Sequence, residues 1–114
     1  MSEALFTFSP ERLGSLLGGP SPELATPCFV YDLDRAATRF AALRAALPDR
    51  VRLAYAVKSN PGAPLLRTFA KQGAWFDCAS AGEIAQVLAA GGTGAEMVVA
   101  GPAKSERDLH AAVY

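Results

Sequence analysis

A lysine near the end of a short apolar run, Arg52–Asn60, is the first residue whose type and setting could do chemistry. The run is too short for a typical helix and is closed by an Asn-Pro-Gly turn, so it predicts a strand. Because side chains alternate along a strand, Ala54, Ala56 and Lys58 would share one face. Two small residues leave space beside the amine. The pattern indicates a lysine beneath a bound cofactor or a substrate carbonyl, and the alternative is an ordinary strand-end lysine in solvent.

An amine in such a place suits Schiff-base chemistry, because a neutral amine attacks carbonyls and removal from water lowers the pKa of a lysine. Asp77 stands in the next apolar run and could lie one strand over. Its carboxylate could hydrogen-bond a cofactor, attract a cationic substrate or simply pair with Lys58. Glu83 is better explained by a helix cap, and Lys104 by a loop cation without a catalytic part. Asn60 could turn the chain or hydrogen-bond near the site.

The elements that must position these side chains follow a regular rhythm from Val51 onward. The expected strands span residues 52–58, 74–79 and 96–100, and a helix is expected after each of them. Ser80 with Glu83 fits a capping box, Ser105 with Asp108 marks the next helix start, and Gly73 suits a helix end. Alternating strands and helices predict βα units and a parallel sheet.

Two architectures fit this rhythm, an open doubly wound sheet and a (β/α)8 barrel. No Gly-x-Gly-x-x-Gly sequence follows the first strand and no P-loop is present, so the main support for the open sheet is missing. In a barrel the chemistry lies at the C-terminal ends of the strands. Lys58, Asp77 and Lys104 all lie at such ends, which favours a site on that rim.

The expected domain organisation has three parts. Residues 1–25 form an N-terminal arm with a short helix that begins at Ser9. Residues 26–50 hold a strand at Cys28–Tyr31 and a helix from Arg35 to about Leu47 that lead into the barrel. Residues 51–114 form its first βα units, so the barrel is incomplete.

Composition excludes several classes of function. Eleven basic and eleven acidic residues cancel, and no block of like charge suggests nucleic acid as a partner. The arginines from Arg35 to Arg52 indicate a solvated helix face and its exit. Cys28 and Cys78 sit in apolar runs and are expected to be buried thiols, and His110 has no companion that would indicate a metal site. No signal peptide or membrane span is expected, which makes the cytoplasm the default location.

Four blocks of the sequence carry a resemblance to a known family. They are PCFVYD at 27–32, YAVKSN at 55–60, FDCAS at 76–80 followed by Glu83, and AGPAK at 100–104. In this order they resemble the opening of the fold-type III pyridoxal-phosphate (PLP) decarboxylases. This is the ornithine/diaminopimelate/arginine decarboxylase family, which is built on an alanine-racemase-like (β/α)8 barrel. The resemblance runs from about Thr26 to the last residue.

The resemblance implies a role for each residue at the strand ends. Lys58 would form the internal aldimine with pyridoxal 5'-phosphate, Ala56 would lie below the cofactor ring, and Asp77 beside the cofactor and substrate. The substrate amine would displace Lys58, and the pyridine ring would take up the electrons left when carbon dioxide departs. The implied substrate is an amino acid of the ornithine, lysine, diaminopimelate or arginine type, in polyamine or lysine biosynthesis. The full-length enzyme would be a homodimer.

The chain departs from the family in length. Family members are several times longer, and the phosphate loop, the ring-stacking histidine, the partner of the pyridine nitrogen and the C-terminal β-domain are missing here. The chain is therefore expected to be an N-terminal portion that is inactive alone. Alternatives are a non-catalytic binding or regulatory fragment, a racemase and a PLP-homeostasis protein. The run from Pro61 to Ala63 argues against a racemase, and the FDCAS block against the homeostasis protein.

Overall fold

The computed structural model describes Glu11 and residues 27–114 and divides the chain into two units, Met1–Asp32 and Leu33–Tyr114. The predicted helix that begins at Ser9 lies outside the described residues, except for Glu11, which is helical. The expected division of the chain at residues 25 and 50 stays a prediction.

The strand predicted at Cys28–Tyr31 is wrong, because this run forms no strand. Phe29 is 92% exposed and Tyr31 is 57% exposed. The tendency of aromatic and β-branched residues to form strands reflects packing on a half-buried pleated surface. A run whose large side chains stay in solvent lacks that surface, so its composition does not make it a strand.

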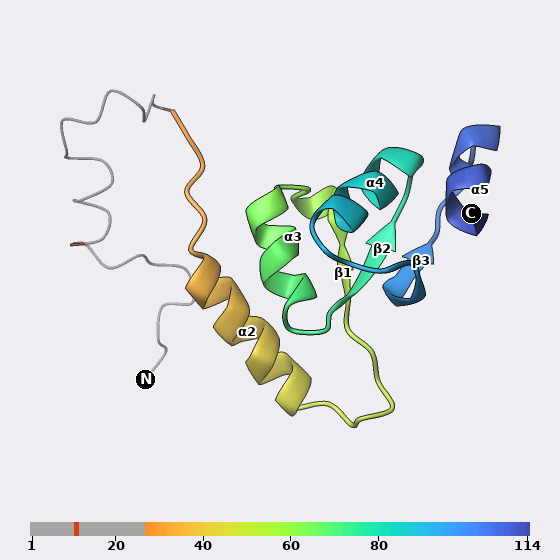
Figure 1. Cartoon of the computed structure of the whole chain (residues 1–114). Coiled ribbons are helices and arrows are strands. Elements are labelled where there is room, and N and C mark those ends of the chain that lie inside the picture. The colour runs from red at the N-terminus through yellow and green to blue at the C-terminus, as the bar shows by residue number, and fades with distance from the viewer. Residues whose placement is uncertain (1–10, 12–26) are drawn as a thin grey trace. The chain divides into compact units, whose positions relative to one another are not determined.

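The unit from Leu33 to Tyr114 is built on a parallel sheet with the strand order β1-β2-β3 (Figure 1). Its strands are β1 (Ala54–Ala56), β2 (Trp75–Cys78) and β3 (Met97–Val99). The predicted parallel βα units are therefore confirmed, although each strand is shorter than its apolar run.

In the unit from Leu33 to Tyr114, four α-helices and two 3₁₀ turns accompany the strands. They are α2 (Leu33–Ala45), η1 (Val57–Ser59), α3 (Ala63–Ala70), α4 (Ala81–Ala89), η2 (Gly94–Glu96) and α5 (Glu106–Val113). Helix α3 carries a proline in its first turn, and Gly73 just after it has a φ of +71°, which a glycine adopts without strain. Helix α2 begins two residues before the expected Arg35 and ends two before Leu47. None of the described helices is long and apolar enough to cross a membrane.

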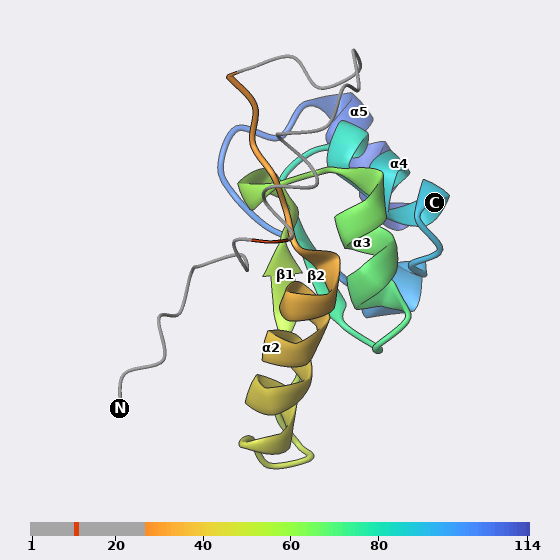
Figure 2. The ribbon, with the colours of Figure 1, turned by 90° about the vertical axis from the view of Figure 1, so that its left-hand side faces the viewer.

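One face of the sheet is covered by helices and holds the core. Figure 2 shows α3 and α4 on the same side of β1 and β2. The largest of the described side chains that are almost completely buried are Phe76, Leu66, Val57, Val87 and Cys78. Helix α2 adds Phe40, whose ring centroid lies 5.5 Å from that of Phe69 in α3. The alternation of half-buried and buried residues on β2 assigns Asp77 to the opposite face.

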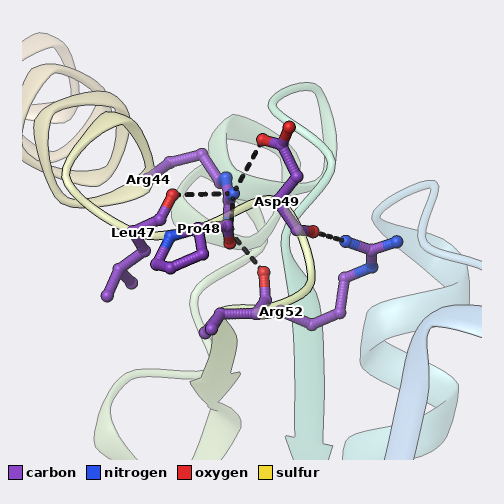
Figure 3. Close-up of polar contacts among 6 residues, drawn as sticks. Arg44, Leu47, Pro48, Asp49 and Arg52 are labelled. Carbon is purple, nitrogen blue, oxygen red and sulfur yellow. Dashed lines mark hydrogen bonds and ion pairs between the residues drawn. The ribbon is translucent and has the colours of Figure 1, made fainter.

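The loop between α2 and β1 is held by two arginines, which the sequence indicated only as part of a solvated face (Figure 3). The guanidinium of Arg44 donates to the carbonyl oxygens of Leu47, Pro48 and Val51. It also lies 3.5 Å from the Asp49 carboxylate. Arg52 donates to the carbonyl of Asp49. These contacts hold the loop at the amino end of β1. The candidate site residues lie at the opposite, carboxyl end of the strand.

Candidate functional site

The residues that the sequence assigns to chemistry lie at the carboxyl ends of the parallel strands or just after them. Lys58 itself is not on the strand, because β1 ends at Ala56 and Lys58 is the second residue of the turn η1. The predicted strand face therefore stops two residues early. Val57 is completely buried, whereas Lys58 and Ser59 are both exposed, so the alternation breaks at the lysine.

Ala56 and Asp77 are direct register partners across β1 and β2, and Val98 of β3 continues the row. Partners in register share one face of a sheet, so Ala56 and Asp77 lie side by side on the same face. Both residues are half-buried. The row places a methyl group next to a carboxylate just before the turn that carries Lys58.

Lys58 forms no ion pair with Asp77 in the described part of the chain. The structural role considered for Asp77, a partner for this lysine, is therefore absent here. A lysine in a barrel mouth is expected to be enclosed. Lys58 is instead exposed. The physical reason is that three strands form an open sheet and do not surround the amine.

Ser80 begins α4 as predicted, because its Oγ accepts a hydrogen bond from the N–H of Glu83 at 3.3 Å. In a capping box the carboxylate of Glu83 would accept a hydrogen bond from the N–H of Ser80, but here it binds the residue before it. It accepts from the N–H of Ala79 at 2.7 Å. Asn60 likewise serves the local chain, since its Oδ1 accepts from the N–H of Gly62 at 2.9 Å. Glu83 and Asn60 thus shape the loops after β2 and β1.

Lys104 has a definite place that the sequence did not predict. Its ammonium donates to the carbonyl oxygen of Ala79 at 2.6 Å and also to that of Ala100. It therefore joins the chain just after β2 to the chain just after β3. A loop cation without a catalytic part was expected, and the structure adds that this cation is bound by two strand-end carbonyls.

Asp108 connects the starts of two helices. Its Oδ2 accepts from the N–H of Ser105 at 3.0 Å and from the Ser105 hydroxyl at 2.6 Å, which completes the capping box of α5. Its Oδ1 accepts from the N–H of Ala81 at 2.7 Å, across 27 residues of sequence. The Ser105 hydroxyl, then the two backbone N–H groups, lower the pKa of Asp108 from 3.8 to about 2.

The substitution Asp108→Asn is expected to make acid less damaging to the fold. A carboxylate whose pKa is lower in the folded chain stabilises it fully above pH 3.8, and this contribution is lost as the pH falls toward about 2. The wild-type urea midpoint should therefore exceed that of the variant above pH 4, and the gap should close near pH 2. Urea unfolding followed by circular dichroism measures it, with Glu106→Gln on the same helix turn as control. A gap of constant size across this range would contradict the assignment.

Among the residues that the structure describes, no group of three or more His, Cys, Asp or Glu side chains could hold a metal ion. The candidate site offers the exposed amine of Lys58, the half-buried carboxylate of Asp77 and the bound cation Lys104. This set suits covalent attachment of a carbonyl compound at Lys58.

Comparison with known proteins identifies the family to which the chain belongs. Residues 33–114 match the family described as "Pyridoxal-dependent decarboxylase, pyridoxal binding domain". The diaminopimelate decarboxylase of Deinococcus radiodurans is 39% identical over 87 residues, which cover 76% of this chain and 23% of that protein.

Two solved structures extend the likeness to the fold. The lysine decarboxylase of Selenomonas ruminantium superposes with a TM-score of 0.79 at 34% identity, covering 94% of this chain and 28% of that one. The diaminopimelate decarboxylase of Helicobacter pylori complexed with L-lysine gives a TM-score of 0.73 at 32% identity, covering 80% and 23%. The predicted fold, the opening units of an alanine-racemase-like (β/α)8 barrel, is confirmed. The chain spans about a quarter of the length of these relatives.

Proposed function

Because the chain belongs to the family of pyridoxal-dependent decarboxylases, we propose that it supplies the cofactor-lysine portion of a PLP-dependent amino-acid decarboxylase. Lys58 is the residue assigned to covalent attachment of the cofactor. The observation that carries the proposal is the placement of Lys58. Its amine is exposed at the carboxyl end of β1, directly beyond the row formed by Ala56 and Asp77.

The residues present fit the covalent part of PLP binding. An amine that reacts with an aldehyde must be accessible, and Lys58 is exposed with no ion-pair partner among the described residues. Ala56 is small enough to leave room for a flat ring above the sheet. Asp77 offers an acceptor for a donor on the cofactor or for a cationic group of the substrate.

When bound, pyridoxal 5'-phosphate withdraws electrons from the substrate carbon that loses its carboxylate as carbon dioxide. The chain's own contribution is to hold the cofactor and to orient it. Lys58 would retain the cofactor through its ε-amine and release it to the incoming substrate amine, while Ala56 and Asp77 would bound the pocket beneath and beside it. The proposed substrate is an amino acid of the ornithine, lysine, diaminopimelate or arginine type.

Because the chain spans about a quarter of its relatives, we propose that these 114 residues alone have little or no decarboxylase activity. Closing a barrel takes about eight strands, and the structure describes three. A complete site would then need further chain or a second subunit, in keeping with the proposed homodimer of the full-length enzyme.

The test is to fix the cofactor on the chain and find where it lies. The sequence contains three lysines, Lys58, Lys71 and Lys104, so peptide mapping can distinguish every side-chain amine. The folded chain is mixed with PLP, reduced with borohydride and digested, and the labelled peptides are quantified by mass spectrometry. We expect the label on Lys58 to exceed that on exposed Lys71, and carbon dioxide release from carboxyl-labelled L-lysine to stay at background.

Two results would count against the proposal. Equal labelling of Lys58 and Lys71 in the folded chain would show an amine with no more than ordinary reactivity. Absence of label from Lys58 would show that Lys58 does not attach the cofactor in this chain. Robust release of carbon dioxide would leave Lys58 in place and overturn only the proposed inactivity.

A further inference from the structure

Residues Ala79–Ala81, directly after β2, are held by three charged side chains. Glu83 accepts from the N–H of the first residue at 2.7 Å, and Asp108 from the N–H of the last at 2.7 Å. Lys104 donates to the first carbonyl at 2.6 Å. Hydrogen bonds with one ionised partner are shorter and stronger than neutral ones. We call these three residues the strand-end clamp. Two of them, Lys104 and Asp108, belong to the next βα unit.

Lys104 lies at the centre of the clamp, where the sheet ladder ends. The last ladder bond between the two strands runs from the N–H of Ala100 to the carbonyl of Cys78 at 3.0 Å. The next two carbonyls, those of Ala79 and Ala100, both accept from the Lys104 ammonium. The ammonium thus continues the connection between β2 and β3 beyond the point where backbone groups pair.

The loop between β3 and α5 is bent to bring this ammonium back over the strand ends. Gly101 has a φ of +102°, and a Cβ there would lie 3.3 Å from Nζ of Lys104. Ala103 has a φ of +56°, which residues with a side chain rarely adopt. Such a conformation persists where surrounding contacts hold it and is often found at functional sites. The residue that follows, Lys104, contacts both strand-end carbonyls.

We propose that Lys104 is a positioning residue of the candidate site. By joining the carboxyl ends of β2 and β3, its ammonium fixes the chain two residues after Asp77. The row of Asp77 and Ala56 then keeps its place beside the turn that carries Lys58. This inference rests on the proposed function, since the consequence of losing Lys104 is weaker retention of the cofactor at Lys58.

The experiment compares three variants of the whole chain in the labelling assay. Lys104→Met keeps most of the stem but removes the donors, Lys104→Arg restores charge and donors, and Lys71→Met removes an exposed lysine elsewhere. The PLP concentration for half-labelling of Lys58 is measured, together with quenching of Trp75, the single tryptophan. Trp75 shares a sheet face with Asp77. We expect a rise of about tenfold for Lys104→Met, little change for Lys71→Met, and rescue to within about threefold by Lys104→Arg.

Each outcome decides for or against the inference. Urea unfolding establishes that every variant is folded, so loss of stability alone is recognised. A folded Lys104→Met chain with wild-type half-labelling overturns the inference, as does failure of Lys104→Arg to rescue. If Lys104→Met does not fold, Lys104→Gln is used instead, because its side chain is uncharged and one bond shorter and cannot join both carbonyls as the ammonium does. Wild-type half-labelling in that folded variant also overturns the inference. Failure of the wild-type chain to label Lys58 would instead count against the proposed function.

Discussion

Substitution of Lys58 by alanine is expected to remove nearly all of the borohydride-fixed cofactor while leaving the fold intact. The side chain is exposed and forms no ion pair in the described part of the chain, so stability should change by no more than about 0.5 kcal/mol. The ε-amine, in contrast, is the group to which we assign covalent attachment. Intact-mass measurement after PLP and borohydride treatment gives the labelled fraction directly.

Two matched variants make this expectation specific. Lys58→Arg keeps a positive charge but has no amine that condenses with an aldehyde, and it should lose the label as completely as the alanine variant. Lys71→Ala removes an exposed lysine from the end of α3 and should keep most of the label. If the Lys58→Ala chain retained the wild-type amount on Lys71 and Lys104, the attachment would be non-specific and the assignment of Lys58 would fail.

Much of the fold could be predicted because its signals are local. Ser80 and Ser105 cap the helices at which they stand, and a proline in the first turn of α3 and Gly73 after it mark that helix. Each of these residues acts on groups within about four positions, so a pattern in the sequence is enough. These caps mark where helices begin and end, and the apolar runs between them mark the strands. Because the two signals agree, the parallel βα order could be predicted.

The remaining features depend on contacts that no local pattern contains. The strand ends at Ala56, and Val57, the first residue of the turn η1, is buried in the core. Lys58 therefore lies in a turn. The apolar run in the sequence does not show where the strand ends. The bond between Asp108 and Ala81 spans 27 residues. The S-x-x-D spacing predicted Asp108 as a cap for its own helix. No pattern in the sequence predicted that its other carboxylate oxygen accepts a hydrogen bond from the N–H of Ala81.

Cys78 is expected to react with thiol reagents far more slowly in the folded chain than in urea. Burial, followed by the charges of Glu83 and Asp77, raises the pKa of the Cys78 thiol from 9.0 to about 11. Because the thiolate is the reactive form, this shift alone lowers the rate at pH 8 about a hundredfold. Contrary to the sequence prediction, Cys28 is exposed, so it should react quickly and serve as the internal reference.

This measurement also tests which face of β2 carries the candidate site. Neighbouring residues of a strand point to opposite faces, so a buried Cys78 requires Asp77 to lie on the face away from the core. A Cys28→Ser chain isolates the signal of Cys78, and Asp77→Asn in that background should raise its rate by removing one of the charges that raise its pKa. If Cys78 reacted in the folded chain as fast as in urea, the strand would have the opposite orientation. Asp77 would then face the core, and the row that it forms with Ala56 could not bound a cofactor pocket.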